Sequence, residues 1–116
     1  MENKLKIVTS KHFPFKGYMA MTILCWMIVR KDLAHKVTSK VINHENIHYA
    51  QERELLFVGF YILYLVFFLV CLVVKLNWHL AYRANPFEKE AYANEGDMSY
   101  LDKRKHFAWI KYFTHK

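Results

Sequence analysis

The chain has 116 residues, enough for one domain, and 54% of them are hydrophobic. Its net charge of +7 is not gathered in one patch or in an RNA- or DNA-binding motif, which argues against nucleic acid as a partner. The two cysteines lie in apolar stretches outside any CxxC or Cys/His cluster, so neither a disulfide nor a cysteine metal site is expected.

The N-terminal region, residues 1–36, is expected to form strands. Residues 18–29 are apolar, but these 12 residues are too few to cross a bilayer as a helix. We expect a strand that turns near Lys31-Asp32 and returns toward Val41 as a short β-hairpin, with an interfacial segment as the alternative. The edge of such a strand is a surface on which an extended peptide can be added.

Residues 37–54 are expected to form a helix that carries a zinc signature. The sequence HENIH at residues 44–48 matches HExxH, in which two histidines four residues apart share one helix face and can bind one Zn²⁺ ion. His44 and His48 are then ligands, and Glu45 is the general base that takes a proton from water. Random placement of histidine and glutamate would give only roughly 0.02 such matches, so we interpret the motif as functional.

Residues 55–76 are expected to form a membrane segment. The 20 residues of 55–74 contain no charged side chain and are long enough to cross a hydrocarbon core of about 30 Å. Nine lysines and arginines precede this run and eight follow it, as expected when both flanks lie on the cytoplasmic side. We expect one long apolar helix or an apolar helical hairpin, located in the inner (cytoplasmic) membrane.

The aromatic and basic residues after this run are expected to form an interfacial collar, and Asn85-Pro86 begins a helix over residues 85–97. The sequence FEKEAY at residues 87–92 resembles the glutamate helix of the gluzincins. These are HExxH zinc metallopeptidases with a downstream glutamate ligand, and they include thermolysin and the membrane-embedded CAAX-processing proteases. The resemblance implies that Glu88 is the third zinc ligand.

The match to the gluzincins departs from their pattern at Tyr92, which stands where related membrane proteases place an aspartate next to the ligands. Glu90 is the alternative ligand. Helix geometry turns Glu90 roughly 200° away from Glu88, so we expect Glu90 to face solvent. Glu52 shares a face with His48, but three ligands on consecutive turns of one helix cannot easily surround an ion tetrahedrally.

A single membrane crossing by residues 55–74 would conflict with this ligand set, because His44 and His48 would lie on one side and Glu88 on the other. Either the apolar segment is not a simple span, or the site forms between chains of a homo-oligomer, or Glu88 is not the ligand. The balanced flanking charge favours the first alternative, with the active site facing the cytoplasm. Basic residues interleave with aromatic ones over residues 98–116, which predicts an amphipathic helix on the membrane surface.

These features predict a mainly α-helical membrane protein that forms a single zincin-like domain. The resemblance implies a zinc metallopeptidase acting at or in the membrane, with the lipid bilayer and a peptide or membrane-protein substrate as partners. Tyr92, His79 and Tyr82 are candidates to support the ligands or to stabilise an oxyanion. The alternative is a non-enzymatic membrane protein with a structural or degenerate zinc site, in which His35, His79 or Glu90 supplies a fourth ligand.

Overall fold

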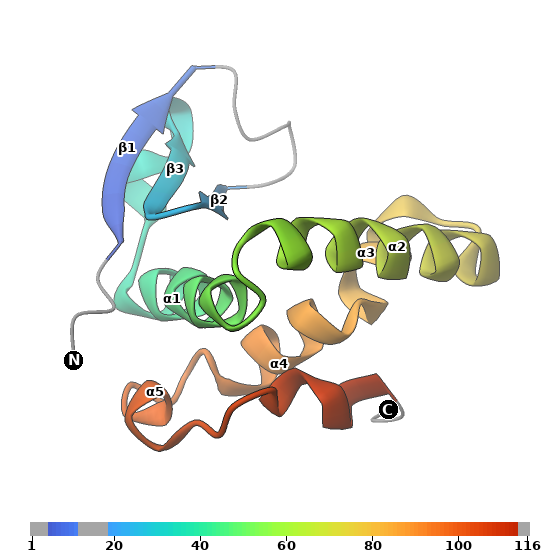
Figure 1. Ribbon diagram of the computed structural model, residues 1–116. Coiled ribbons are helices and arrows are strands. Elements are labelled where there is room, and N and C mark those ends of the chain that lie inside the picture. The colour runs from blue at the N-terminus through green and yellow to red at the C-terminus, as the bar shows by residue number, and fades with distance from the viewer. Residues whose placement is uncertain (1–4, 12–18, 114–116) are drawn as a thin grey trace.

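A three-stranded sheet forms the N-terminal part of the computed structural model, which describes residues 5–11 and 19–113. Strand β1 (Lys6–Ser10) pairs in parallel with β3 (Trp26–Arg30), and β2 (Ala20–Ile23) pairs with β3 in the antiparallel direction. Among these residues β2 is therefore an edge strand of the sheet. It lies next to helix α1 (Ser39–Glu54), below the sheet in Figure 1.

A β-hairpin is present in the N-terminal region, but it is not the expected one, because the segment predicted as one strand forms both β2 and β3. The chain reverses at Leu24, whose φ of 53° lies in the left-handed region, and not at Lys31-Asp32. The N–H of Leu24 donates to the hydroxyl of Tyr61, 2.8 Å away, so a residue 37 positions later holds the turn. Lys31–Lys36 then form a 3-10 helix, η1, in place of the expected returning strand.

Helix α1 matches the helix expected over residues 37–54. Its N-cap is Thr38, whose hydroxyl oxygen accepts a hydrogen bond from the Val41 N–H at 3.3 Å. The buried face of α1 is mainly polar and consists of Asn43, His44, Glu45, Ile47, His48, Gln51 and Glu52. Because buried polar groups need partners, this composition indicates that α1 packs against other polar groups more than against an apolar core.

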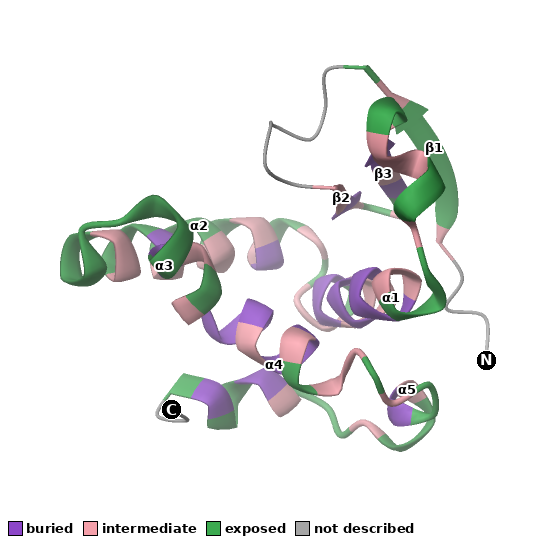
Figure 2. Ribbon diagram, turned by 180° about the vertical axis from the view of Figure 1, so that it is seen from behind, coloured by how far each residue is buried: buried purple, intermediate pink, exposed green. Residues whose placement is uncertain are grey.

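A tight turn joins α1 to the apolar helix α2 (Val58–Lys75), with Leu56 and Phe57 both at positive φ. Helix α2 is the one helix, within the described ranges, that is long and apolar enough to cross a membrane, and 11% of it is buried. The short helix α3 (Trp78–Ala84) packs back against α2, and most of this α2–α3 pair is exposed or half-buried in Figure 2. The apolar segment is thus one helix, and α3 supplies the return.

Helix α4 (Pro86–Asn94) corresponds to the helix expected over residues 85–97. Its N-cap is Asn85, whose side-chain oxygen accepts a hydrogen bond from the Phe87 N–H at 3.0 Å, and Pro86 occupies the first turn. Helix α4 packs against α1 on one side and against the C-terminal segment on the other (Figure 1).

Residues 98–113 do not form the single amphipathic helix expected over residues 98–116, and residues 114–116 lie outside the described part of the chain. Residues 98–113 instead form a four-residue helix, α5 (Tyr100–Lys103), and a 3-10 helix, η2 (Ala108–Phe113). Arg104 between them has an extended backbone with φ −65° and ψ 133°. Trp109 packs beside Phe87 with a ring-centroid distance of 4.7 Å, so an aromatic side chain of the tail is buried against α4.

Two apolar clusters hold α4 in place. One consists of Ile47, Ala91 and Tyr100, and the other consists of Phe60, Phe87 and Trp109. Each cluster includes one residue of α4, so α4 is fixed against α1 and against α2 together. This position brings Glu88, the residue after Phe87, close to the HExxH face of α1.

Candidate metal centre

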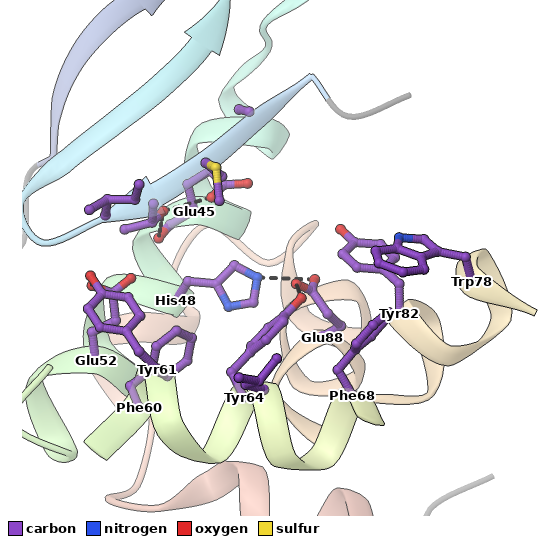
Figure 3. Close-up of a pocket in the computed structure, with 15 residues that line it drawn as sticks. Glu45, His48, Glu52, Phe60, Tyr61, Tyr64, Phe68, Trp78, Tyr82 and Glu88 are labelled. Atoms are coloured by element: carbon purple, nitrogen blue, oxygen red, sulfur yellow. Dashed lines mark hydrogen bonds and ion pairs between the residues drawn. The ribbon is translucent and has the colours of Figure 1, made fainter. Parts of the chain in front are cut away.

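Two histidines of α1 and one glutamate of α4 meet below the sheet. The Nε2 atoms of His44 and His48 lie 3.2 Å and 3.1 Å from Oε1 of Glu88. All three residues are buried, and one potential ligand atom from each lies within 4.8 Å of the others. Figure 3 shows His48 of α1 pointing toward Glu88 of α4. This group can hold a metal ion.

The other ring nitrogen of each histidine faces an oxygen atom. Nδ1 of His44 lies 2.7 Å from Oε1 of Glu95, and Nδ1 of His48 lies 2.8 Å from Oε1 of Gln51. The orientation of the Gln51 amide is fixed because its Nε2 donates to the carbonyl oxygen of Phe87. Amide and carboxylate oxygens only accept hydrogen bonds, so both Nδ1 atoms carry the proton in the neutral rings.

The two Nε2 atoms of the neutral rings therefore present lone pairs to Oε1 of Glu88, which also has only lone pairs. Three acceptors meet with no donor between them, and a cation would relieve this arrangement. Ligand atoms bound to a tetrahedral zinc ion at about 2.0–2.1 Å lie about 3.3 Å from one another. The separations of 3.1 Å and 3.2 Å between Oε1 of Glu88 and the two Nε2 atoms are close to that value, and all three atoms lie within 4.8 Å of one another, so the group could hold a metal ion of this size.

Glu88 is held as a carboxylate in this position. Its second oxygen, Oε2, accepts a hydrogen bond from the Tyr64 hydroxyl at 2.7 Å, which leaves Oε1 for the histidines. Burial opposes the charge on Glu88, but the nearby imidazoles of His48 and His44 outweigh burial and lower its pKa. Burial likewise opposes a charged His48, but the Glu88 carboxylate raises its pKa to about 10. A proton thus competes with a metal ion for this site.

Glu45 lies beside the three ligands and is oriented by the sheet. The Thr22 hydroxyl of β2 lies 2.7 Å from Oε1 of Glu45 and 3.1 Å from its backbone carbonyl oxygen, within donating distance of both. Glu45 also lines the cavity in front of the ligands. A carboxylate fixed in this way is suited to accept a proton from a water molecule at the ligands.

Glu90 does not face solvent, contrary to the expectation from helix geometry. It is fully buried, and the side chain of Arg104 donates to both of its oxygens. Tyr100 donates to Oε2 of Glu90 at 2.6 Å, and Gln51 donates to Oε1 at 2.9 Å. The roughly 200° rotation from Glu88 was right, but the tail covers that side of the helix.

The three aromatic candidates differ in their distance from the ligands. The Tyr92 ring packs against the His44 ring with centroids 4.5 Å apart, and its hydroxyl lies 3.0 Å from that of Tyr82. Tyr82 lines the cavity with Glu45 and Glu88. His79 is exposed, and its ring centroid lies 6.1 Å from that of Tyr82. His79 does not belong to the ligand group.

A cavity of about 590 Å³ opens in front of the ligands. Figure 3 shows Glu52 and Tyr61 on one side of His48, and Tyr82 and Trp78 on the other. Apart from the carboxylates, His48 and Thr22, its walls are mostly apolar and aromatic, with Ala20, Met21, Ile23, Phe60, Tyr61, Tyr64, Leu65, Phe68, Trp78 and Tyr82. No lysine or arginine lines it within the described part of the chain.

Glu52 is a third buried carboxyl of the same cavity. Its Oε1 accepts a hydrogen bond from the Tyr61 hydroxyl at 2.9 Å, but its Oε2 has no hydrogen-bond partner. Burial raises the pKa of Glu52 to about 7. Glu52 does not belong to the ligand group, so the expectation that it would not bind the metal stays consistent with the geometry.

Several residues of the site were not identified from the sequence. Glu95 and Gln51 contact the histidines, Tyr64 contacts Glu88, and Thr22 contacts Glu45. Gln51 lies one helical turn after His48, so the local spacing could have found it. The other three contacts join residues 23 to 51 positions apart, and no local pattern signals them.

No protein-family model, no curated protein and no solved structure matches this chain.

Proposed function

We propose that this protein is a zinc-dependent metallopeptidase that hydrolyses peptide bonds at or in a membrane. The observation that carries the proposal is the meeting of three acceptor atoms, from His44, His48 and Glu88, next to the fixed carboxylate of Glu45. Two histidines and one carboxylate are the protein ligands that catalytic zinc sites use when one position stays open. Gluzincins are the class of enzyme that this ligand set resembles.

The chain's own residues divide the chemistry of hydrolysis. A zinc ion bound by His44, His48 and Glu88 supplies Lewis acidity toward a peptide carbonyl and a water molecule. The Glu45 carboxylate takes the proton of that water and later delivers it to the leaving amine. Thr22 keeps Glu45 aimed at the cavity, and the Tyr82 hydroxyl is the candidate donor to the developing oxyanion.

An open ligand position supports an enzyme over a structural zinc site. Within the described residues, the ligand group consists of His44, His48 and Glu88. His35, His79 and Glu90 do not belong to it. The Glu90 carboxylate instead accepts a hydrogen bond from Arg104. A closed site would need a fourth protein ligand.

The α2–α3 pair supports an association with the membrane from one side. The Tyr64 hydroxyl contacts Glu88, and the Asn85 side chain donates to the Tyr64 carbonyl oxygen at 3.2 Å. The chain therefore leaves the site along α2 and returns along α3 to the middle of α2. We propose that this apolar pair enters the inner membrane from the cytoplasmic face, with the zinc site facing the cytoplasm.

The decisive experiment measures zinc and hydrolysis together in the detergent-solubilised protein. We expect one equivalent of zinc, lost in both His44→Ala and His48→Ala, and hydrolysis of a fluorogenic peptide mixture. Glu45→Gln should keep the zinc and the fold but abolish hydrolysis, because it removes the proton acceptor and preserves the volume. Asp102→Asn, which removes an exposed carboxylate on α5, is the control. Wild-type hydrolysis in Glu45→Gln would refute the assignment.

Membrane topology is tested by labelling single cysteines placed at Lys36 and Lys103, which are both exposed. In sealed inner-membrane vesicles of known orientation, both positions should react from the cytoplasmic face only. Reaction from opposite faces would show that the chain crosses the membrane between them.

A further inference from the structure

A second cavity, of about 390 Å³, adjoins the first at the general base. The two cavities share Ala20, Glu45 and Tyr82. Along β2 and along α1, the earlier residues line the second cavity and the later residues line the first. Met19, which directly precedes β2, lines the second cavity, and Ile23, the last residue of β2, lines the first. The cavities are thus two arms of one cleft, and Glu45 lies where the arms meet.

Helix α1 divides the cleft in the same way. Lys40, Val41 and His44, from its first half, line the second cavity, whereas His48 and Glu52 line the first. A chain laid along the edge of β2 would therefore pass from one arm to the other over Glu45 and the ligands. The bond to be cut would lie at the junction of the arms.

The first cavity is the apolar arm. Its outer rim is formed by Leu65 of α2 and Trp78 of α3, which are 57% and 59% exposed. Both rim residues belong to the apolar surface of the α2–α3 pair, together with Ile62, Val66, Leu69 and Val73. The apolar arm therefore opens on the surface that, in the proposed function, faces the membrane.

The second cavity is the more polar of the two, and we call it the polar arm. Its walls include Lys40, Glu95 and the Tyr92 ring besides the polar residues already described. Lys40 is exposed, and its Nζ lies 3.4 Å from Oε2 of Glu95. The polar arm thus has charged groups at its rim, and neither α2 nor the apolar end of α3 contributes to it.

We propose that the substrate is a membrane-associated polypeptide that is cut at the boundary between an apolar segment and a polar one. This inference rests on the proposed peptidase function and names its substrate class. The apolar segment lies in the arm next to α2 and α3, and the polar segment lies between β2 and the first half of α1. Water adds across the peptide bond above Glu45, which gives a new carboxylate and a new amine on the two sides of the boundary.

The test compares peptides of identical composition in detergent solution. Two have an apolar block and a polar block, in either order, and a third alternates apolar and polar residues. Cleavage sites are mapped by mass spectrometry with the wild-type enzyme, and binding to Glu45→Gln is measured by fluorescence anisotropy. We expect one block order to be cut within a residue or two of its boundary, and the alternating peptide to bind about tenfold more weakly or worse.

A pair of variants distinguishes binding of the block peptide in the apolar arm from its binding to the detergent micelle. Leu65→Gln changes the rim of the apolar arm, whereas Leu69→Gln changes an exposed leucine one helical turn away that does not line either cavity. Leu65→Gln should weaken binding of the block peptide by about tenfold, because an apolar contact of one leucine is lost. Leu69→Gln should leave that binding unchanged.

Different results would refute the proposed peptidase function and the proposed substrate class. Boundary-selective binding without any hydrolysis would refute the peptidase function and support the two-arm cleft. Hydrolysis with equal preference for the alternating peptide, or with cuts spread inside one block, would overturn the substrate class alone. Equal effects of Leu65→Gln and Leu69→Gln would also overturn it, and the absence of both binding and hydrolysis would overturn both proposals.

Discussion

Two buried charged clusters contain residues of both α1 and α4, and their carboxylates have different kinds of partner. The histidine cluster consists of His44, His48 and Glu88, and the arginine cluster consists of Arg104, Glu54 and Glu90. The side chains of both clusters are at most 7% exposed. In the arginine cluster every carboxylate meets donors of the chain itself, including the Phe107 N–H, which donates to Glu54 at 2.6 Å.

The histidine cluster has no such donor from the chain when its rings are neutral. Among the described residues, the Tyr64 hydroxyl donates to Glu88 from outside the cluster, and the three central atoms are acceptors as long as both rings are neutral. Gln51 joins the clusters, because its Oε1 faces His48 while its Nε2 donates to Glu90 at 2.9 Å. The difference indicates that the arginine cluster carries its own permanent cation, whereas the histidine cluster is completed either by a proton on His48 or by a metal ion.

Removing the cation of the arginine cluster should have the largest effect on stability. Arg104→Met leaves Glu54 and Glu90 buried without a positive charge, so we expect the free energy of unfolding to fall by about 3–5 kcal/mol. Denaturant titration measures this change. Lys103→Met, at an exposed neighbouring position, should change stability little. Equal stability of Arg104→Met and the wild type would remove the distinction between the clusters.

Glu52 belongs to neither cluster, and it tests how much the burial of such a carboxyl lowers the free energy of unfolding. Its pKa, raised by burial from the ordinary 4.5 to about 7, means that the native state keeps this proton while the unfolded chain loses it. The free energy of unfolding of the metal-free protein should therefore fall between about pH 4.5 and pH 7, by up to about 3 kcal/mol.

Glu52→Gln should remove this part of the pH dependence. The measurement is denaturant titration of both proteins at several pH values, with the difference between them taken at each pH. The variant should gain on the wild type as the pH rises from about 4.5 to about 7, and the difference should level off above pH 7. A difference that does not change with pH would show that Glu52 ionises in the native state as it does in the unfolded chain.

Glu95 should affect zinc affinity without forming part of the ligand group. Glu95→Ala removes the oxygen that fixes the Nδ1 proton of His44, so we expect zinc to bind about 10- to 100-fold more weakly. Lys40→Met is the matched control, because it removes the ion pair of Glu95 and keeps the contact with His44. Competition with a chromogenic chelator gives both affinities. A similar loss in the two variants would show that the ion pair with Lys40, and not the contact with His44 alone, is what zinc affinity depends on.

The smallest expected effect concerns the donor to Glu88. Tyr64→Phe removes the hydroxyl that holds Oε2 of Glu88, and zinc should bind several-fold more weakly, a change of about 1 kcal/mol. Tyr92→Phe removes a hydroxyl that bonds only to that of Tyr82 among the contacts described here, so zinc affinity should be unchanged. A larger loss in Tyr92→Phe than in Tyr64→Phe would reverse these roles.

The sequence predicted those parts of the site that depend on spacing within one helix. His44, Glu45 and His48 share a face because they lie within one turn, and the helix over residues 37–54 was placed almost as observed. Glu88 depended on a resemblance, and the structure brings it to the histidines without a second chain. The mainly helical fold and the small sheet were also predicted.

The errors arose where distant residues decide the structure. The amphipathic pattern of the tail predicted one helix, but Arg104 adopts an extended backbone and reaches both Glu54 and Glu90, which interrupts that helix. The same contacts bury Glu90, which its own helix would leave exposed. The turn at Leu24 likewise depends on Tyr61. Periodicity describes one element at a time and does not show what packs against it.

Arg104 follows both ligand helices in the chain, and this order has a consequence for biosynthesis. A ribosome completes the motif at residues 44–48 and then Glu88 well before it adds the arginine that joins α1 to α4. A nascent chain thus contains every proposed ligand while Glu54 and Glu90 still lack their cation, so we expect the pair of helices to be loosely held until translation passes residue 104. Acquisition of the metal, and any hydrolysis that depends on it, would then wait until residue 104 has left the ribosome and reached α1 and α4.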